Sequence, residues 1–382
     1  MKPRKHRVEF RRNRSPRPRS GDLTRSSADA DGPDLLLPDE RITGKGDLSR
    51  KRTVVGRSSD SRDALPVLPT APGACQGRVL LVHGLTSDVE RTDGVVVRCT
   101  IKRILKTMLT RQRTVLTAGD RVEFIGDSSG GVITAILPRT SALSRTSRGR
   151  LHVIVANVDQ VIIVGSAAEP HLKPGLIDRL IVAAETSGIR PIICINKVDL
   201  VDPAELVPLA GMYARMGYAT LLCSTRNGMG ISRLAAELPG RVTAVVGQSG
   251  VGKSSLLNSV CPNLDLRVAE VSSDNQKGRH TTTTARLLPH DFGGHFVDTP
   301  GIRQFQLWQV VGAEASSSFR DIRPFANNCR YPNCTHSHET FCAVKDAVAD
   351  GLLDTGRWAS CSQLVREGVD GSSDPQALYS VL

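Results

Sequence analysis

The sequence predicts a multidomain protein with a small N-terminal β-barrel, a central α/β domain built on a mostly parallel sheet, and a mainly helical, zinc-binding C-terminal domain. Three observations predict this organisation. Short strand-like runs separated by glycine and aspartate fill residues 75–145. Apolar runs alternate with helical patterns over residues 146–312, as in a parallel sheet covered by helices on both faces. Closely spaced cysteines and a histidine then stand in residues 313–382.

Length and composition narrow the class of protein. The chain has 382 residues, enough for two or three domains. It contains no run of roughly 20 apolar residues that could cross a bilayer, and no apolar stretch follows the basic N-terminus as a secretory signal requires, so we expect no membrane partner. The odd total of nine cysteines, some in apolar runs, indicates a reducing compartment and a cytoplasmic protein. The net charge of +12 favours a polyanionic partner.

Residues 1–74 are expected to form a disordered basic extension, because they are rich in arginine, serine, aspartate, proline and glycine and poor in aromatic residues. Residues 1–20 alone carry nine lysines and arginines against one glutamate. Such a tail can lie along RNA phosphates. A solubilising extension explains the same composition, and the sequence leaves both interpretations open.

The barrel is predicted from four runs, residues 77–83, 94–101, 120–125 and 131–136. Four or five short strands in about 60 residues favour the OB-fold, a barrel that often binds nucleic acid. Stacking residues are nearly absent, since Phe124 stands alone, so we expect RNA contacts through phosphates and shape. The basic residues among the strands are Arg78, Arg98, Lys102, Arg103, Lys106, Arg111 and Arg113. Residues 138–145 follow as a polar connector.

A glycine-rich turn lies between the apolar run 242–246 and a helix-compatible stretch at 255–258. It reads G-x-x-x-x-G-K-S, the pattern of a phosphate-binding P-loop. Glycines let the backbone approach an anion, while successive N–H groups and the positive helix end face the phosphates. Lys253 is expected to reach the terminal phosphates and the Ser254 hydroxyl to bind Mg²⁺. The predicted nucleotide contacts are Gly247, Gln248, Ser249, Gly250, Val251, Gly252, Lys253, Ser254 and Ser255.

Recognition of guanine is predicted after the apolar run 192–195, which ends in Asn196, Lys197, Val198 and Asp199. A carboxylate there can accept hydrogen bonds from guanine N1–H and from its exocyclic amino group, and adenine offers no such pair. Asn196 can brace the loop, and the Lys197 stem can cover the base. Ser224 and Thr225 follow the next predicted strand and fit the element that backs guanine O6. The motif is weak alone and strong beside a P-loop, so we expect GTP or GDP.

Two further segments fit the switches that sense the γ-phosphate. Asp298 ends a predicted strand and supplies a carboxylate near Mg²⁺, and Gly301 can bond the γ-phosphate. The run Thr281 to Thr284 is expected to contain the threonine that senses phosphate and metal, and we favour Thr282. The sequence does not decide among these four, and an ordinary strand would also explain the run.

The sequence does not identify the group that orients the attacking water. Ile302 follows Gly301, where many GTPases place a glutamine. An aliphatic side chain cannot orient water, so intrinsic turnover is expected to be slow. His280 is the nearest candidate for a catalytic replacement, and a packing role for His280 explains its position equally well.

The order of these motifs is permuted. The guanine motif precedes the P-loop, and both switches come last. Permutation is tolerated where chain ends lie close together. Because the second switch leads directly into the C-terminal region, we expect the bound nucleotide to alter the orientation of the C-terminal domain.

The C-terminal region places Cys329, Cys334, His336 and Cys342 within a short segment. Three thiolates and an imidazole complete a tetrahedral, structural Zn²⁺ site and leave no open position for catalysis. His338 is a competing ligand, and unrelated free cysteines are the alternative. We do not expect Cys361 to bind the metal.

These motifs together resemble the ribosome small-subunit-dependent GTPase A family (RsgA, also called YjeQ). The resemblance covers about residues 75–367 and includes residues 119–122 and 137–145. It implies a permuted GTPase that acts late in small-subunit maturation, with GTP hydrolysis stimulated by the subunit and coupled to release. The implied partners are the subunit and its rRNA, with assembly factors as further partners of a monomer. Residues 1–74 lie outside the family pattern, and Thr225 stands where the family often has alanine.

Two functions of different classes fit these motifs. One is an RNA-stimulated GTP hydrolase; the other is a nucleotide-gated RNA-binding adaptor whose hydrolysis is incidental, which Ile302 keeps open. A P-loop kinase is disfavoured, because it would leave residues 196–199 without a role.

Overall fold

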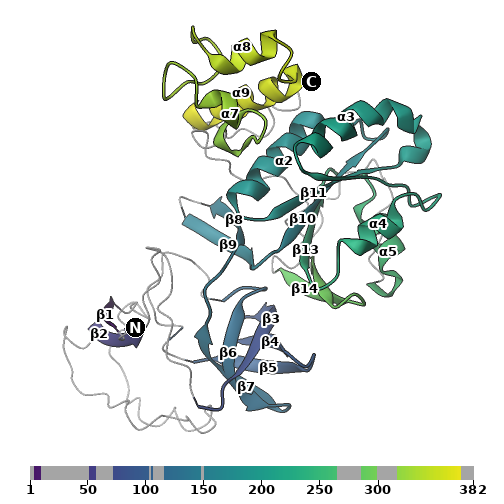
Figure 1. The fold of residues 1–382 in the computed structure, drawn as a ribbon. Helices are drawn as coiled ribbons and strands as arrows, with labels where there is room; N and C mark the ends of the chain where they lie inside the picture. Colours follow the sequence, from purple (N-terminus) through teal and green to yellow (C-terminus); the bar gives the residue numbers. More distant parts are fainter. Residues whose placement is uncertain are drawn as a thin grey trace, which may run out of the picture.

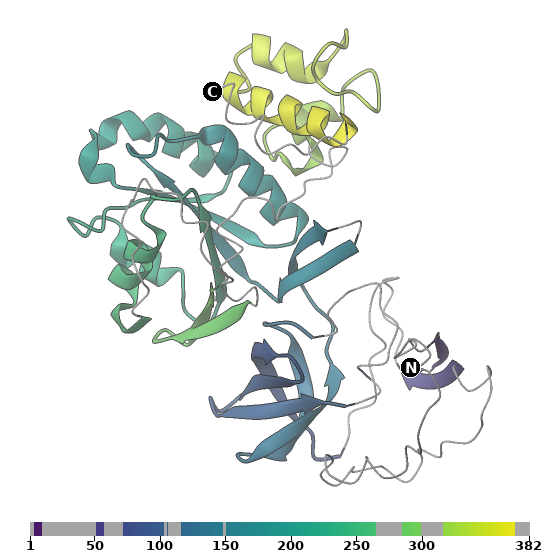
Figure 2. The ribbon, with the colours of Figure 1, turned by 180° about the vertical axis from the view of Figure 1, so that it is seen from behind.

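The structure is a computed structural model that describes residues 4–9, 51–56, 72–102, 105, 116–147, 150–264, 285–298 and 316–370. The barrel and the C-terminal helices lie at opposite ends of the molecule, with the α/β domain between them (Figures 1 and 2). Within the described residues, no helix is both long and apolar enough to cross a bilayer.

The barrel consists of β3 (Cys75–His83), β4 (Thr86–Arg91), β5 (Val96–Ile101), β6 (Arg121–Asp127) and β7 (Gly130–Ile136). Neighbours pair in the order β3-β4-β5-β7-β6, and an additional pairing of β3 with β6 closes the ring. This closed five-stranded ring confirms the predicted OB-type barrel. β4 was missing from the sequence runs because only Val89 in it is a strongly apolar residue facing the core.

The barrel core follows the two-residue period of strands. Val79, Val89, Val97, Phe124 and Ile133 alternate inward and are almost fully buried. Phe124 therefore fills the interior and is not available for stacking on a base.

The connector after the barrel is more ordered than predicted. Its second half belongs to β8 (Ala142–Ser147), which pairs with β9 (Arg150–Ala156) in an antiparallel hairpin. Its first half is held by Arg139, which donates from Nε and Nη2 to the buried carboxylate of Asp120 at 2.7 and 2.8 Å. The predicted polar connector, residues 138–145, therefore runs into a strand at Ala142.

The central sheet contains β10 (Gln160–Ser166), β11 (Arg190–Asn196), β12 (Ala219–Leu222), β13 (Val242–Gly247), β14 (Arg286–His290) and β15 (Gly294–Asp298). The spatial order is β12-β11-β10-β13-β15-β14, with parallel pairing up to β15 and an antiparallel β14 at the end. β14 also pairs with β3 through Arg286 and Leu81, so the sheet continues into the barrel.

Helices cover both faces of this sheet. They are α2 (Pro174–Thr186), α3 (Pro203–Arg215), α4 (Ile231–Ala236) and α5 (Lys253–Val260), with short 3₁₀ turns at Val198–Leu200 and Pro262–Leu264. Ile163 and Ile193 pack in one core with residues of α2 and α3, whereas Ile162 and Ile192 pack in the other with residues of α4 and α5. Adjacent residues of one strand thus enter different cores, which explains why these strands are apolar throughout.

Two strands lie in the N-terminal region that was expected to be disordered. β1 (Arg4–Glu9) and β2 (Lys51–Gly56) pair antiparallel. The remainder of residues 1–71 lies outside the described part of the chain.

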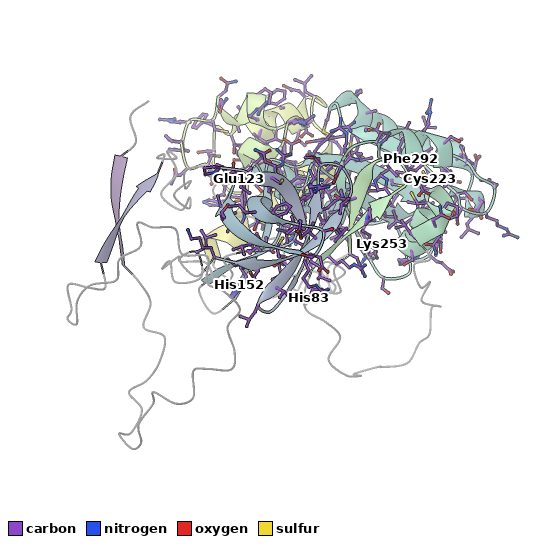
Figure 3. All side chains as sticks on the ribbon, turned by 90° about the horizontal axis from the view of Figure 1, so that it is seen from below. His83, Glu123, His152, Cys223, Lys253 and Phe292 are labelled. Atoms are coloured by element: carbon purple, nitrogen blue, oxygen red, sulfur yellow. The ribbon has the colours of Figure 1, made fainter. Side chains whose placement is uncertain are left out.

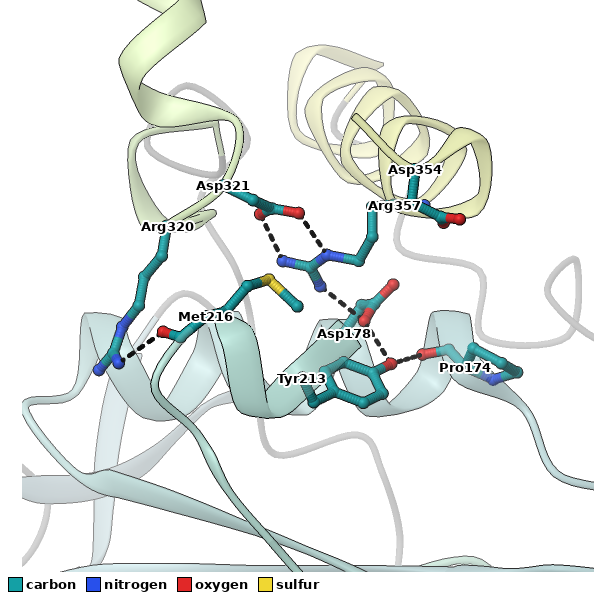
Figure 4. Close-up of polar contacts among 8 residues, drawn as sticks. All are labelled: Pro174, Asp178, Tyr213, Met216, Arg320, Asp321, Asp354 and Arg357. Atoms are coloured by element: carbon teal, nitrogen blue, oxygen red, sulfur yellow. Dashed lines mark hydrogen bonds and ion pairs between the residues drawn. The ribbon is translucent and has the colours of Figure 1, made fainter. Parts of the chain in front are cut away.

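The C-terminal part is helical, as predicted, with α7 (Arg323–Ala326), α8 (Ala343–Ala349) and α9 (Thr355–Asp370). Its core includes Phe319, Ile322 and Val344, together with Val182 from α2. Arg357 of α9 joins the two parts: Nη1 donates to Asp178 of α2 at 2.6 Å, and Nε and Nη2 donate to Asp321 at 3.0 and 2.8 Å (Figure 4). Tyr213 of α3 donates its hydroxyl to Asp178 at 2.7 Å, so three helices meet at this carboxylate.

Candidate functional site

The turn after β13 has the backbone that a P-loop requires. Gly247 and Gly252 have φ values of 150° and 89°, which favour glycine. A Cβ at Gly247 would lie 2.2 Å from the carbonyl oxygen of Val164, and one at Gly252 would lie 2.5 Å from Nδ2 of Asn196. Both glycines are therefore required by close neighbours as well as by their backbone angles.

Lys253 is the first residue of α5, directly after this turn (Figure 3). Its Nζ donates to the carbonyl oxygens of Gly247 at 2.9 Å and Gln248 at 2.5 Å, so the ammonium group lies across the mouth of the loop. Ser254 and Ser255 follow in the first turn, half-buried. A positive charge and the N-terminus of an eight-residue helix together favour an anion at this position.

The predicted guanine loop is tied directly to the P-loop. Asn196 ends β11, is buried, and donates from Nδ2 to the carbonyl oxygen of Val251 at 2.9 Å. Its Oδ1 has no hydrogen-bond partner among the described residues. A buried amide oxygen without a partner is costly unless a ligand or water satisfies it, so this atom is consistent with a bound base or water at the loop.

Asp199 and Ser224 come together at the same edge of the sheet. The Ser224 hydroxyl donates to Asp199 Oδ1 at 2.5 Å and accepts from the backbone N–H of Arg226 at 3.1 Å. Val198 lies beneath them, fully buried, with its N–H on the carbonyl oxygen of Cys223 at 3.2 Å. Thr225, the other predicted residue of this element, is half-buried. The Ser224 hydroxyl thus orients the exposed Asp199 carboxylate through one of its two oxygens.

One neighbouring loop was missed by sequence reasoning. Lys197, whose φ is 62°, donates from Nζ to the carbonyl oxygen of Glu169 at 2.6 Å, and the Ser166 hydroxyl donates to the same oxygen at 2.9 Å. Residues 166–173 thereby lie beside the P-loop, and a pocket is lined by His171, Lys173 and Gln248 among others. No sequence motif marks this loop, because its position depends on the register of β10 beside β13.

The predicted switch residues are only partly described. Asp298 is the last residue of β15, half-buried, and pairs in register with Arg286. β15 is the parallel neighbour of β13, so Asp298 and the P-loop follow adjacent strands at one edge of the sheet. His280, Thr282, the other threonines of the run, Gly301 and Ile302 lie outside the described residues.

A separate cluster lies in the C-terminal domain, where Cys329, Cys334, His336 and Cys342 bring their ligand atoms within 4.8 Å of one another. The sulfurs of Cys329 and Cys342 are 3.8 Å apart, and each is 3.5 Å from Nδ1 of His336. Tetrahedral zinc, with bonds of about 2.3 Å to sulfur and about 2.0 Å to nitrogen, separates two sulfurs by about 3.8 Å and a sulfur from a nitrogen by about 3.5 Å. The four residues therefore fit a zinc ion. Within the described part of the chain, neither His338 nor Cys361 belongs to this cluster.

The surroundings of this cluster favour a bound cation. Burial raises the pKa of Cys334 to about 12 and also raises the pKa of Cys342, whereas burial lowers the pKa of His336. Without a cation the group consists of neutral thiols and a neutral imidazole, and a divalent ion would stabilise the thiolate forms. The backbone is set for this geometry, since the His336 carbonyl accepts from Trp358 Nε1 at 2.8 Å.

These features define the class of protein. A P-loop, a guanine-type loop braced against it and a sheet whose strands follow a permuted order describe a circularly permuted GTPase of the P-loop class. A family model described as RsgA GTPase matches residues 136–308. The small ribosomal subunit biogenesis GTPase RsgA of Azotobacter vinelandii is 43% identical over 293 residues, which cover 74% of this chain and 83% of that protein. This chain belongs to the RsgA family of GTPases.

Further comparisons agree with this assignment. The small ribosomal subunit biogenesis GTPase RsgA 1 of Vibrio vulnificus is 35% identical over 306 residues, 79% of this chain and 86% of that protein. The crystal structure of YjeQ from Thermotoga maritima matches with a TM-score of 0.64 and 32% identity, covering 78% of this chain and 99% of that one. That of YloQ, described as a circularly permuted GTPase, matches with a TM-score of 0.62 and 28% identity, covering 78% and 96%.

Proposed function

We propose that this GTPase binds the small ribosomal subunit through its RNA and assists a late step of subunit maturation, with GTP hydrolysis stimulated by the subunit and coupled to release. The printed names of its relatives support the ribosomal role. The net charge of +12 and the OB-type barrel support a polyanionic partner. We propose a cytoplasmic monomer, with assembly factors as further partners.

The roles of the nucleotide-binding residues follow from the site. The free oxygen of Asp199 accepts from guanine, while Asn196 links the base-binding loop to the P-loop. Lys253 moves its ammonium group from the loop carbonyls onto the terminal phosphates. Ser254 and Asp298 hold Mg²⁺, directly and through water respectively. The observation that carries the nucleotide assignment is the hydrogen bond from Asn196 to Val251, because it joins the two loops into one site.

Hydrolysis itself is proposed to depend on the partner. Ile302 cannot orient water, so the subunit either supplies a polar group or positions His280 beside the γ-phosphate. Thr282 is proposed to sense the γ-phosphate and Mg²⁺ in the same segment. Turnover without the subunit is then slow.

The Cys₃His cluster is proposed to hold one structural Zn²⁺. Four protein ligands leave no position for a substrate, so the metal fixes the C-terminal loops. Metal analysis of purified protein is expected to give one zinc per chain, and Cys334→Ser is expected to lose it. Cys361→Ser is the matched control, because Cys361 is buried in the same domain but is not in the cluster. A protein without zinc, or a Cys334→Ser variant that keeps it, would contradict the proposal.

The central test is multiple-turnover GTP hydrolysis with and without small subunits. We expect strong stimulation of the wild-type enzyme and no turnover by Lys253→Ala, whose role is charge at the phosphates. Equal turnover with and without subunits would favour the nucleotide-gated adaptor, provided that nucleotide-dependent binding to the subunit persists.

The base assignment has its own test. Asp199→Asn is expected to lose affinity for GTP and to gain affinity for xanthosine triphosphate, because a carboxamide presents a donor where guanine also presents one. The measurement is competition binding with the two nucleotides. Unchanged preference for guanine would remove Asp199 from the site.

A further inference from the structure

Large exposed aromatic side chains are rare in this protein. Within the described residues they are Phe292, Tyr331 and Phe341, with exposed fractions of 37%, 42% and 68%. Phe292 lies at the turn between β14 and β15 (Figure 3), with the centre of its ring 5.7 Å from that of His290. Tyr331 and Phe341 both lie close in sequence to cysteines of the Cys₃His cluster, and one arginine contacts both rings.

That arginine is Arg330. Its guanidinium carbon lies 5.0 Å from the centre of the Phe341 ring and 5.9 Å from the centre of the Tyr331 ring. Both distances are within the range of a cation–π interaction. The three residues are exposed and therefore form one surface in which a guanidinium contacts two rings. We call Arg330, Tyr331 and Phe341 the aromatic patch.

The cluster holds the patch in place. Arg330 follows Cys329 and Phe341 precedes Cys342, and these two cysteines are neighbours in the cluster. The N–H of Arg330 donates to the carbonyl oxygen of Phe341 at 3.3 Å, which ties the two segments together. Phe341 has a φ of 58°, a conformation that an aromatic residue adopts only when its surroundings impose it. A large apolar ring is thus held in solvent by a strained backbone.

Arg330 is the one lysine or arginine in the segment 327–341. Glu339 is the one acidic residue in the segment 327–341. Burial alone would raise its pKa, but hydrogen bonds from Thr335 and Ser337 lower that pKa to about 2. The carboxylate is therefore already satisfied within its own loop. The guanidinium of Arg330 contacts the two rings rather than this carboxylate.

We propose that the aromatic patch stacks on unpaired bases of RNA, with Arg330 contacting the adjoining base or phosphate. Exposed aromatic rings and arginine planes are the side chains on which single-stranded bases stack. The proposal rests on the proposed function, since it names the part of the C-terminal domain that touches RNA. It also places base stacking in the C-terminal domain rather than in the barrel, where Phe124 is buried.

A protein partner fits these observations less well. A stable protein interface needs a wide buried area with an apolar centre. The residues around the patch in sequence are polar and exposed, namely Asn327, Asn328 and Asn333. Amide side chains next to rings can read the edges of unpaired bases. The described surface thus combines stacking, charge and hydrogen bonding on the scale of one or two nucleotides.

The test uses the full-length, zinc-loaded protein and an unstructured oligoribonucleotide that carries 2-aminopurine, whose fluorescence falls when the base stacks. The wild type is expected to quench this fluorescence. Phe341→Ala is expected to lose the quenching and to bind roughly 5- to 100-fold more weakly, the range for loss of one stacking contact. Phe341→Trp is expected to restore both signals.

Matched controls separate stacking from folding. Phe292→Ala removes an exposed ring elsewhere, and Leu352→Ala removes an apolar side chain with an exposed fraction of 64% in the same domain. Both are expected to bind as the wild type does. Zinc content and the emission of Trp358, which donates to the His336 carbonyl, report whether the C-terminal domain is intact.

Two results would overturn the proposal. One is a Phe341→Ala variant with intact zinc that quenches and binds as the wild type does. The other is a variant that loses binding to small subunits but not to the oligoribonucleotide, which would make the patch a protein contact. Failure of the proposed function is distinguishable, because there the wild type itself is neither stimulated by nor bound to small subunits.

Discussion

The GTPase domain carries a neighbour on each flank, and the two junctions are built on different principles. The C-terminal domain is fixed by Arg357, whose side chain is only 1% exposed and bridges Asp178 and Asp321 (Figure 4). Burial raises the pKa of Asp178, which the hydrogen bonds from Arg357 and Tyr213 oppose by stabilising the carboxylate. Apolar packing of α9 and Val182 surrounds this pair. The junction is a buried ion pair inside a core.

The barrel is attached through several smaller contacts. Its β3 pairs with β14 at Arg286 and Leu81. His295 of β15 then bridges two barrel residues, with Nε2 2.7 Å from Glu90 and Nδ1 3.3 Å from Arg78. Arginine can only donate, so Nδ1 accepts and Nε2–H donates to Glu90, which makes His295 neutral. Leu80 and Ala118 also enter the apolar core of the GTPase domain, and the carbonyl oxygens of Ala118 and Gly119 accept from Ala156 N–H and Asn157 Nδ2, both at 2.9 Å. This junction therefore combines a short sheet contact, a half-buried polar bridge and apolar packing.

The two neighbouring domains differ in whether they contact the strands next to the predicted switches. β14 directly follows the first predicted switch, residues 278–284, and β15 ends at Asp298. The barrel touches both strands, whereas the C-terminal domain is anchored on α2. The sequence predicted that nucleotide state acts on the C-terminal domain through residues 298–305; that prediction stands untested, since residues 299–315 lie outside the described chain.

The largest expected effect comes from breaking the buried junction. Arg357→Met leaves the Asp178 carboxylate buried without its cation, and is expected to lower the free energy of unfolding by about 3–5 kcal/mol. Arg320→Met is the matched control, because Arg320 also pairs with an acid of α2, Glu185, but is 38% exposed. It is expected to cost about 1 kcal/mol or less. Denaturant unfolding followed by Trp358 emission measures both, and equal losses would show that burial does not distinguish the two pairs.

A smaller effect is expected at the barrel junction. Glu90→Ala removes the acceptor of the His295 N–H and is expected to cost about 1–2 kcal/mol, the scale of a buried donor left unsatisfied. Asp93→Ala, which breaks the exposed pair with Arg91 on the same barrel, is expected to leave stability unchanged. Limited proteolysis in the linker at residues 137–141 reports the docking of the barrel. Equal cleavage of the Glu90→Ala variant and the wild type would contradict the role of the bridge.

The smallest expected effect is a pH dependence of the same bridge. Burial lowers the pKa of His295; Glu90 opposes this shift, and Arg78 adds to it. The unfolded state then binds the proton more readily than the folded state, so this contribution is full well above the unfolded pKa of about 6.5 and is lost as pH falls below it. His295→Gln keeps a donor and an acceptor but does not titrate. We expect its stability to vary less between pH 7.5 and 5.5 than that of the wild type, and parallel profiles would contradict this.

Much of the site could be predicted because it is encoded locally. Residues 247–254 require a strand, a glycine turn and a helix in immediate succession, and residues 329–342 place four metal-binding side chains within one loop region. Local spacing therefore fixes both groups before any long-range contact forms. β4 and β8 escaped prediction because their side chains are mostly polar, and their strand character comes from pairing with neighbours.

The sequence by itself determined the order of the domains, the alternation of strands and helices, and the chemistry that the P-loop, the guanine motif and the cysteine group favour. The tertiary structure decided which distant residues contact one another. The pairing of Arg357 with Asp178 joins residues 179 positions apart, and the contact of His295 with Glu90 joins residues 205 positions apart. No local sequence pattern around Arg357 or His295 identifies the partner of that residue. Such contacts exist only after sheet order and helix packing have brought distant side chains together, because burial and pairing depend on the folded environment rather than on neighbours in the chain.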